Sequence, residues 1–168
     1  MTVSENSKRD IVDLLALYGV TDPDDIAGFL DAFSDWLEHH RQDPGVTPAA
    51  LSTEDFWHHL SAFFASLGWG RLDFEQLHPG VAALSSLQWA EADASAGARQ
   101  PMCHFTTGML ADLLSRVIGS DLAVLEVSCR SRGDGSCRFL VGSADALQLV
   151  FEGLRQGQPL ETAVGGLT

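Results

Sequence analysis

Residues 126–139, EVSCRSRGDGSCRF, place a glutamate and two cysteines at the two ends of a short charged loop that contains two glycines. Apolar runs flank this loop on both sides, LAVLEVSC at 122–129 and CRFLV at 137–141. Two short apolar runs separated by a glycine-containing loop predict two antiparallel strands that form a hairpin. We therefore expect Cys129 and Cys137 to lie at the two ends of one hairpin loop.

The segment before this hairpin has helical periodicity. Pro101 suits the first position of a helix, and Gly119 lies just past its end. Met102, Phe105, Met109, Leu113 and Val117 mark one apolar face of this helix, and Cys103, Thr107, Leu110 and Leu114 mark a second one. A helix with two apolar faces is buried on both. The third cysteine of the chain, Cys103, is thus placed in the first turn of a buried helix.

Three further helices are expected before residue 70. Apolar residues recur at helical spacing over residues 11–18, over residues 22–37 and over residues 52–68. Asp22 and Ser52 are the expected N-cap residues of the second and third helices. The segment between them, 39–51, loses this periodicity and contains two prolines and a glycine, which is typical of a linker.

From Gly70 the period changes towards two. The runs 71–77 and 81–92 predict two antiparallel strands, with His78, Pro79 and Gly80 as the turn between them. A last helix is expected from Ala146, and the small, polar tail after residue 157 is expected to fray. The order of elements predicts an α+β domain in which helices pack against an antiparallel sheet.

Length and charge limit the function. With 168 residues, 45% of them hydrophobic, the chain is long enough for one globular unit with a core of its own. The net charge of −13 repels a phosphate backbone and an anionic membrane surface, so neither nucleic acid nor membrane is an expected partner. The sequence shows no signal peptide and no long apolar span, so we expect a soluble, cytoplasmic protein.

The three cysteines have two interpretations. Three thiols cannot all pair within one chain, and in a reducing compartment they are either free or bound to a metal. Cys103, Cys129 and Cys137 supply three sulfur ligands, and Glu126 is the nearest acid that can complete a tetrahedral zinc site. In an ideal strand Glu126 and Cys129 point to opposite faces, so the strand must bulge or end near Ser128. Spacing alone leaves open whether the thiols bind metal or are small buried hydrophobic residues.

The loop also contains the tripeptide Arg132-Gly133-Asp134, which can serve as a receptor ligand in extracellular proteins. A cytoplasmic loop meets no such receptor. A turn built on Gly133 and Gly135 is the favoured interpretation.

A family resemblance strengthens the metal interpretation. The run from residue 103 to residue 142, with E-x2-C-x7-C followed by RFLVGS, resembles the 4-vinyl reductase domain family of bacteria and archaea. In phenol-sensing members of that family, a cysteine on a helix and a later Glu, Cys and Cys hold a structural zinc. The resemblance therefore implies that Cys103, Glu126, Cys129 and Cys137 are zinc ligands.

The resemblance also implies a fold and an assembly. The family fold is a mixed α/β domain shared with Golgi tethering subunits (TRAPP) and haem nitric oxide sensors, which agrees with the order of elements above. Family members commonly form dimers, so a homodimer is expected. We expect an N-terminal helical extension over residues 1–45, which serves dimerisation or a partner, and a zinc-binding sensor domain over residues 46–168.

Sensor members of the family bind a small apolar or aromatic ligand in a buried pocket close to the zinc. Candidates for the walls and polar anchors of such a pocket are Trp57, Phe64, Trp69, Trp89, His78, His104 and Phe105. Aromatic residues at helical spacing are also typical of an ordinary core. His104 adjoins Cys103, but the metal role of its neighbour turns His104 the other way around the helix.

No catalytic arrangement is apparent in the sequence. Gly133 and Gly135 lack the third glycine and the following helix of a dinucleotide-binding motif, and a zinc with four protein ligands leaves no position for a substrate water. We expect a non-enzymatic, zinc-stabilised sensor that signals through a protein partner. The alternative is an accessory or scaffold protein, for example in tetrapyrrole metabolism, with no pocket ligand.

Overall fold

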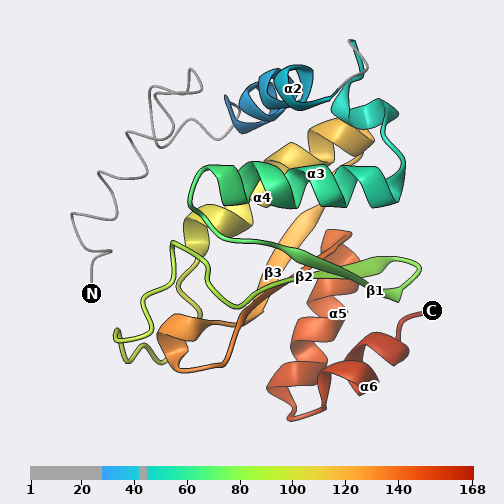
Figure 1. The fold of residues 1–168 in the computed structure, drawn as a ribbon. Helices are drawn as coiled ribbons and strands as arrows, with labels where there is room; N and C mark the ends of the chain where they lie inside the picture. Colours follow the sequence, from blue (N-terminus) through green and yellow to red (C-terminus); the bar gives the residue numbers. More distant parts are fainter. Residues whose placement is uncertain (1–27, 42–44) are drawn as a thin grey trace.

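The computed structural model describes residues 28–41 and 45–168; the helix expected over residues 11–18 and the cap expected at Asp22 lie outside these residues. A four-stranded antiparallel sheet forms the centre of the domain, in the order β1-β2-β4-β3. The strands are β1 (Asp73–His78), β2 (Val81–Ser86), β3 (Ala123–Ser128) and β4 (Cys137–Gly142). The two predicted hairpins thus join through β2 and β4, and the predicted α+β class with an antiparallel sheet is confirmed (Figure 1).

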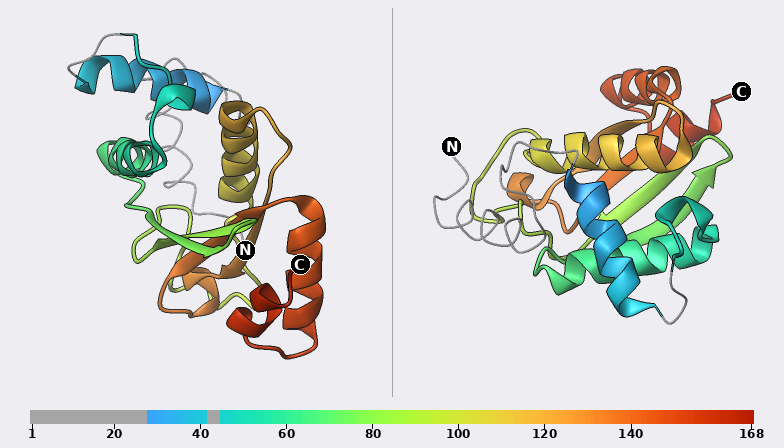
Figure 2. Two further views of the ribbon diagram at one scale, coloured as in Figure 1. Left: turned by 90° about the vertical axis from the view of Figure 1, so that its right-hand side faces the viewer. Right: turned by 90° about the horizontal axis from the view of Figure 1, so that it is seen from above.

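Helices cover both faces of this sheet (Figure 2). One face carries α2 (Gly28–His40), α3 (Thr53–Ser66) and α4 (His104–Ile118), and the other carries α5 (Ala144–Arg155) and α6 (Leu160–Gly165). Two short 3-10 helices, η1 (Pro48–Ala50) and η2 (Arg130–Arg132), lie in the connections. Helix α2 packs into the same core as α3 and α4, and the division of the chain near residue 45 stays a prediction.

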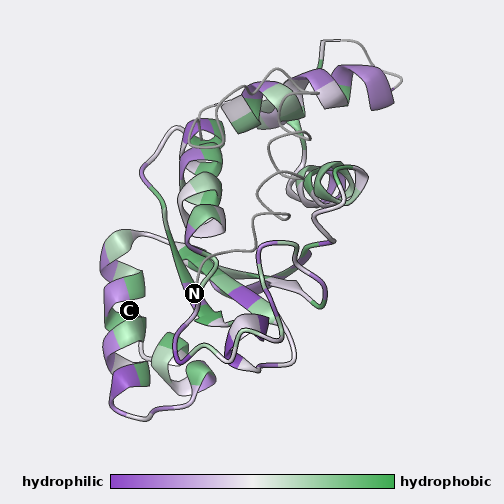
Figure 3. Cartoon of the chain, turned by 90° about the vertical axis from the view of Figure 1, so that its left-hand side faces the viewer, coloured by the Kyte–Doolittle hydropathy of each residue, from purple (hydrophilic) through white to green (hydrophobic). Residues whose placement is uncertain are grey.

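Alternation along the strands creates two hydrophobic cores. In β4, Phe139 packs in the core under α2, α3 and α4, while its neighbour Leu140 packs in the core under α5 and α6. Successive side chains of a strand point to opposite faces, so a continuous apolar run serves a sheet that is covered on both sides. Hydropathy colours show green strands between helices that alternate green and purple, as amphipathic helices do (Figure 3).

Two predicted helix boundaries are confirmed by their caps. The Ser52 side chain accepts a hydrogen bond of 3.1 Å from the Asp55 backbone N–H at the start of α3. Gly119 ends α4 in the left-handed conformation, with φ of 72°, and its N–H donates to the Ser115 carbonyl. Helix α4 begins later than Pro101 predicted, because Cys103 takes the N-cap position.

Two other predictions are wrong at their ends. The second strand, expected over residues 81–92, ends at Ser86, because Trp89 leaves the sheet and donates its indole N–H to Thr106 in the core. The tail after residue 157 does not fray. It contains α6, which buries Ala163 and Val164 against the second core, so two apolar residues were sufficient to anchor it.

Candidate metal centre and apolar groove

The hairpin of β3 and β4 brings Glu126 and Cys129 to the same side. The pairing of β3 with β4 shifts register between Glu126 and Ser128, which is the bulge that the parity of these positions required. After the bulge, η2 carries the chain around to Cys137 at the start of β4. The expectation that the strand is irregular near Ser128 is confirmed.

Three buried sulfur atoms and one carboxylate meet at this point. The ligand atoms of Cys103, Glu126, Cys129 and Cys137 all lie within 4.8 Å of one another. The Cys103 Sγ is 3.9 Å from the Cys129 Sγ and 4.0 Å from the Cys137 Sγ, and the three cysteines are fully buried and unbridged. Among the described residues, this is the group of four that can hold a metal ion.

Hydrogen bonds of the loop fix the sulfur positions. The Asp134 carboxylate accepts from the Cys129 N–H at 2.8 Å and from the Arg132 side chain at 2.7–2.9 Å. Gly133, with φ of 96°, makes the turn between these two residues. The Arg130 N–H donates to the Cys137 Sγ at 3.5 Å. The Arg132-Gly133-Asp134 tripeptide is thus the internal brace of the loop.

Two carboxylates hold the N-terminus of α4. Glu126 Oε2 accepts from the Cys103 N–H at 2.9 Å. Glu91 accepts from the Phe105 and Thr106 N–H groups, both at 2.8 Å, and from the Thr106 hydroxyl. These amides have no partner within a helix, and an anion at this end is favoured by the helix dipole. Glu91 therefore positions the turn that carries Cys103, a role that the sequence did not reveal.

The thiols and Glu91 have perturbed proton affinities. A hydrogen bond from Cys103 lowers the pKa of Cys137 to about 7, and the same bond, followed by burial, raises the pKa of Cys103. Burial raises the pKa of Cys129. Burial also raises the pKa of Glu91, against the hydrogen bonds from Thr106 and Phe105. A metal ion would reverse the cost that burial places on the thiolates.

The donor set fits a metal ion on one further observation. Glu126 Oε1 is buried and has no hydrogen-bond partner in the described part of the chain. An unpaired carboxylate oxygen beside three buried sulfurs costs free energy, and a cation at the centre of the four groups removes that cost. The structure therefore brings together all four residues that the sequence predicted as ligands.

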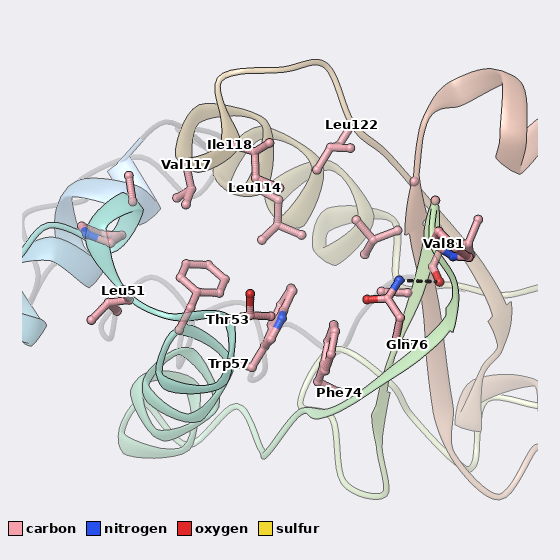
Figure 4. Close-up of a pocket in the computed structure, with 18 residues that line it drawn as sticks. Leu51, Thr53, Trp57, Phe74, Gln76, Val81, Leu114, Val117, Ile118 and Leu122 are labelled. Atoms are coloured by element: carbon pink, nitrogen blue, oxygen red, sulfur yellow. Dashed lines mark hydrogen bonds between the residues drawn. The ribbon is translucent and has the colours of Figure 1, made fainter.

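An apolar groove of about 460 Å³ lies at the other end of α4. Trp57 of α3 and Phe74 of β1 stack with ring centroids 4.7 Å apart on one side, and Leu114 and Val117 of α4 line the other (Figure 4). Ile118, which also lines the groove, is 60% exposed, so the groove is open. Eleven residues of helix separate Cys103 from Leu114, which is about 16 Å. The groove is thus distant from the metal centre, unlike the expected pocket close to the zinc.

The predicted pocket residues divide among three places. Trp57 lines the groove. Four others pack against one another in the first core near the start of α4, with ring centroids 5.4–6.1 Å apart: Phe64, Trp69, Trp89 and Phe105. His78 lies at the β1–β2 turn, where its Nδ1 accepts from the Gly80 N–H. His104 is exposed at the start of α4 and lines a separate hollow.

Sequence reasoning missed most of the groove. Thr53 and Gln76 supply polar atoms to it, and Leu114 and Val117 supply apolar ones. The only signal in the sequence was the second apolar face of the predicted helix, to which Leu114 belongs. Nothing in the spacing showed that this face would border a groove.

The sheet, the helix N-terminus and the four ligand atoms define an α+β domain with a candidate Cys3Glu metal centre. Residues 89–143 match the family model of the 4-vinyl reductase domain, so this part of the chain is such a domain, as its sequence resemblance implied. The match covers Cys103, Glu126, Cys129 and Cys137. The family name hints at a reductase and does not establish an activity.

Two solved structures are similar in fold. The phenol-responsive sensory domain of the transcription activator PoxR, solved with phenol, has a TM-score of 0.47 and 16% identity, over 95% of this chain and 84% of that one. A vinyl-4-reductase family protein from Methanocaldococcus jannaschii has a TM-score of 0.47 and 18% identity, over 86% of this chain and 99% of that one. No curated protein matches the sequence. None of the described helices combines the length and the apolar character needed to cross a bilayer.

Proposed function

We propose that this protein is a zinc-stabilised module that binds a small hydrophobic or aromatic molecule and transmits its presence to a protein partner. The single observation that carries the proposal is the buried Cys3Glu cluster inside a 4-vinyl reductase domain, on a helix whose other end walls an apolar groove. In this proposal the metal is structural, the groove is the ligand site, and the protein is not an enzyme.

Zinc suits the cluster better than a hard cation does. Thiolate sulfurs favour zinc, and Zn–S bonds of about 2.3 Å in a tetrahedron separate two sulfurs by about 3.8 Å. The observed separations of 3.9 and 4.0 Å are close to this value. Cys103, Cys129, Cys137 and Glu126 Oε1 would fill all four positions. A zinc held in this way supplies folding energy and has no open position for a substrate, which supports a structural role.

The groove has the properties of a site for a small molecule. Its volume of about 460 Å³ lies in the range of roughly 300–1,000 Å³ that is usual for ligand sites. Its walls are mainly apolar, and Thr53, Trp57 and Gln76 add polar atoms. The Trp57 indole N–H makes no hydrogen bond to the described residues, while Gln76 donates to the Val81 carbonyl at 3.2 Å. We infer a ligand with an apolar body and one polar group.

The remaining features of the proposal concern location and assembly. We infer a bacterial, cytoplasmic protein that acts as a homodimer, and we assign no direct role to nucleic acid or membrane because the net charge is −13. Signal output through a regulatory partner agrees with a chain in which the described domain carries no catalytic group of its own beyond the metal cluster.

A metal analysis followed by a ligand screen tests the proposal. The protein is purified without a histidine tag or added metal, and about one zinc per chain is expected, with three thiols released together by a chelator. Thermal-shift titrations with phenols, other aromatic molecules and porphyrins should then give saturable stabilisation by one class of ligand.

The variant Trp57→Ala should abolish that stabilisation and retain the zinc. The matched variant His78→Ala changes an aromatic side chain near the same strands, outside the groove lining, and should leave the response intact. Absence of zinc contradicts the metal assignment. No saturable response to any class, with zinc present, would favour the accessory or scaffold role.

A further inference from the structure

The described part of the chain leaves few cations unpaired. Five of its arginines have an acidic, aromatic or histidine partner: Arg41, Arg116, Arg132, Arg138 and Arg155. In the same part, Arg71, Arg99 and Arg130 form no ion pair. In a chain with 23 acidic residues against 10 basic ones, an arginine without a partner is unusual. Two of these three arginines, Arg71 and Arg130, line one groove.

This second groove lies where β1 begins and β2 ends. It has a volume of about 790 Å³ and is separate from the apolar groove, with which it shares no lining residue. Arg71 comes from the segment before β1, and Arg130 comes from η2, next to Cys129. Leu87, which is 72% exposed, and Trp89 add an apolar border.

A buried hydroxyl without a partner also lines this groove. Ser86 is 2% exposed, and its Oγ has no hydrogen-bond partner in the described structure. A buried donor that lacks an acceptor costs free energy, and a ligand oxygen would satisfy it. Gly70, with φ of 116°, lies beside this hydroxyl. A Cβ at residue 70 would be 3.3 Å from Ser86 Oγ and only 2.0 Å from the Gln88 carbonyl oxygen, so the groove needs a glycine here.

We propose that this groove binds the phosphate group of a small organic phosphate, through the guanidinium groups of Arg71 and Arg130 and the hydroxyl of Ser86. Guanidinium groups form paired hydrogen bonds with phosphate or carboxylate oxygens. Two guanidiniums with a hydroxyl match three oxygens and two charges, which a phosphate monoester offers and a carboxylate does not. The apolar border formed by Leu87 and Trp89 would contact the organic part of such a ligand.

One charge on the lining opposes this ligand. Asp73 lines the same groove and forms no ion pair in the described structure. Arg71, Arg130 and Asp73 together leave the lining with one net positive charge. Because the whole chain carries −13, non-specific binding of anions is unfavourable, and only a local site can bind phosphate. Asp73 also gives the test a variant that should gain affinity.

The test is a titration of the zinc-loaded protein with inorganic phosphate, followed by calorimetry and thermal shift at constant ionic strength. We expect saturable binding that chloride and acetate at the same ionic strength do not reproduce. Arg71→Gln and Arg130→Gln should each weaken it at least about tenfold, since each removes a charge-assisted hydrogen bond. Ser86→Ala should weaken it less, and Asp73→Asn should strengthen it.

The matched control is Arg99→Gln. Arg99 is an exposed arginine without an ion pair, and it does not line the groove, so this variant should bind phosphate as the parent does. Zinc content is measured for every variant, because Arg130 adjoins Cys129; if Arg130→Gln loses metal, Arg71→Gln decides the outcome. An equal loss in Arg99→Gln, equal binding of acetate, or no saturable binding of phosphate would each overturn the proposal.

Discussion

Helix α4 begins at a cluster of buried sulfur and carboxylate groups and ends at an apolar groove that is open to solvent. At the first end, four polar ligands lie within 4.8 Å of one another and are held by hydrogen bonds to the backbone. At the second end, the lining comes from α3, α4, three strands and η1, and most of its contacts are apolar. The first end is fixed by directional bonds, while the second depends on how the elements pack.

The difference teaches where stability and binding reside in this domain. A structural metal couples its own binding to folding, so changes at the first end should affect the whole protein. The groove is lined by side chains that already have a neighbour, and its loss should change ligand binding with little effect on folding. Variants along α4 therefore separate the two roles.

The largest effect is expected from Cys137→Ser. The variant removes one sulfur ligand and leaves two thiolates and a carboxylate without a full coordination shell, so zinc is lost and stability falls by several kcal/mol. Zinc content and urea denaturation measure the two results. The chelator-treated parent is the control, and it should be about as unstable as the variant. A variant that keeps zinc and melts like the parent would contradict the metal assignment.

Glu126→Gln should have a smaller effect at the same end. The amide still offers an oxygen to the metal and can still accept from the Cys103 N–H, but it lacks the negative charge. We expect zinc to be bound more weakly, with a stability between those of the parent and Cys137→Ser. Competition with a chelator of known affinity measures the change. Equal zinc affinity in Glu126→Gln and the parent would show that Glu126 is not a ligand.

Glu91→Gln tests whether the metal end depends on a residue that does not touch the metal. The variant loses charge-assisted hydrogen bonds to the Phe105 and Thr106 N–H groups, which should cost about 1–3 kcal/mol. Because these amides belong to the turn that follows Cys103, zinc should also dissociate faster. Denaturation with zinc bound and chelator-driven release are the measurements. Unchanged release would limit Glu91 to a capping role.

The sequence predicted these two ends unequally. Glu126, Cys129 and Cys137 lie close together in the chain, and the chemistry of thiolates and carboxylates restricts what such a cluster can do, so the ligand set was predictable, including the bulge near Ser128. The groove combines residues from Pro48 to Gly142 that only the tertiary fold brings together. Apolar residues such as Leu114 serve a core as well as a groove, so periodicity alone does not distinguish the two.

Ala82→Phe should close the groove and leave the metal end unchanged. Ala82 lines the groove from β2, and a phenyl ring there would occupy the space beside Phe74. Ligand-dependent stabilisation should be lost, zinc should be retained, and overpacking should cost about 1–3 kcal/mol at most, since the groove is open. Thermal shift with and without ligand separates these results. Ala146→Phe, on the opposite face of the sheet, is the control for a general effect of packing.

The smallest effect is expected from His104→Ala, one residue from Cys103. His104 is exposed, its side chain has no hydrogen bond in the described structure, and the sulfur of Cys103 faces the buried cluster. Exposed substitutions of this kind change stability by about 0.5 kcal/mol or less, so zinc content and denaturation should both match the parent. A clear loss of zinc in His104→Ala would mean that the histidine competes with Glu126 for the fourth position, and the two ends of α4 would then need a different comparison.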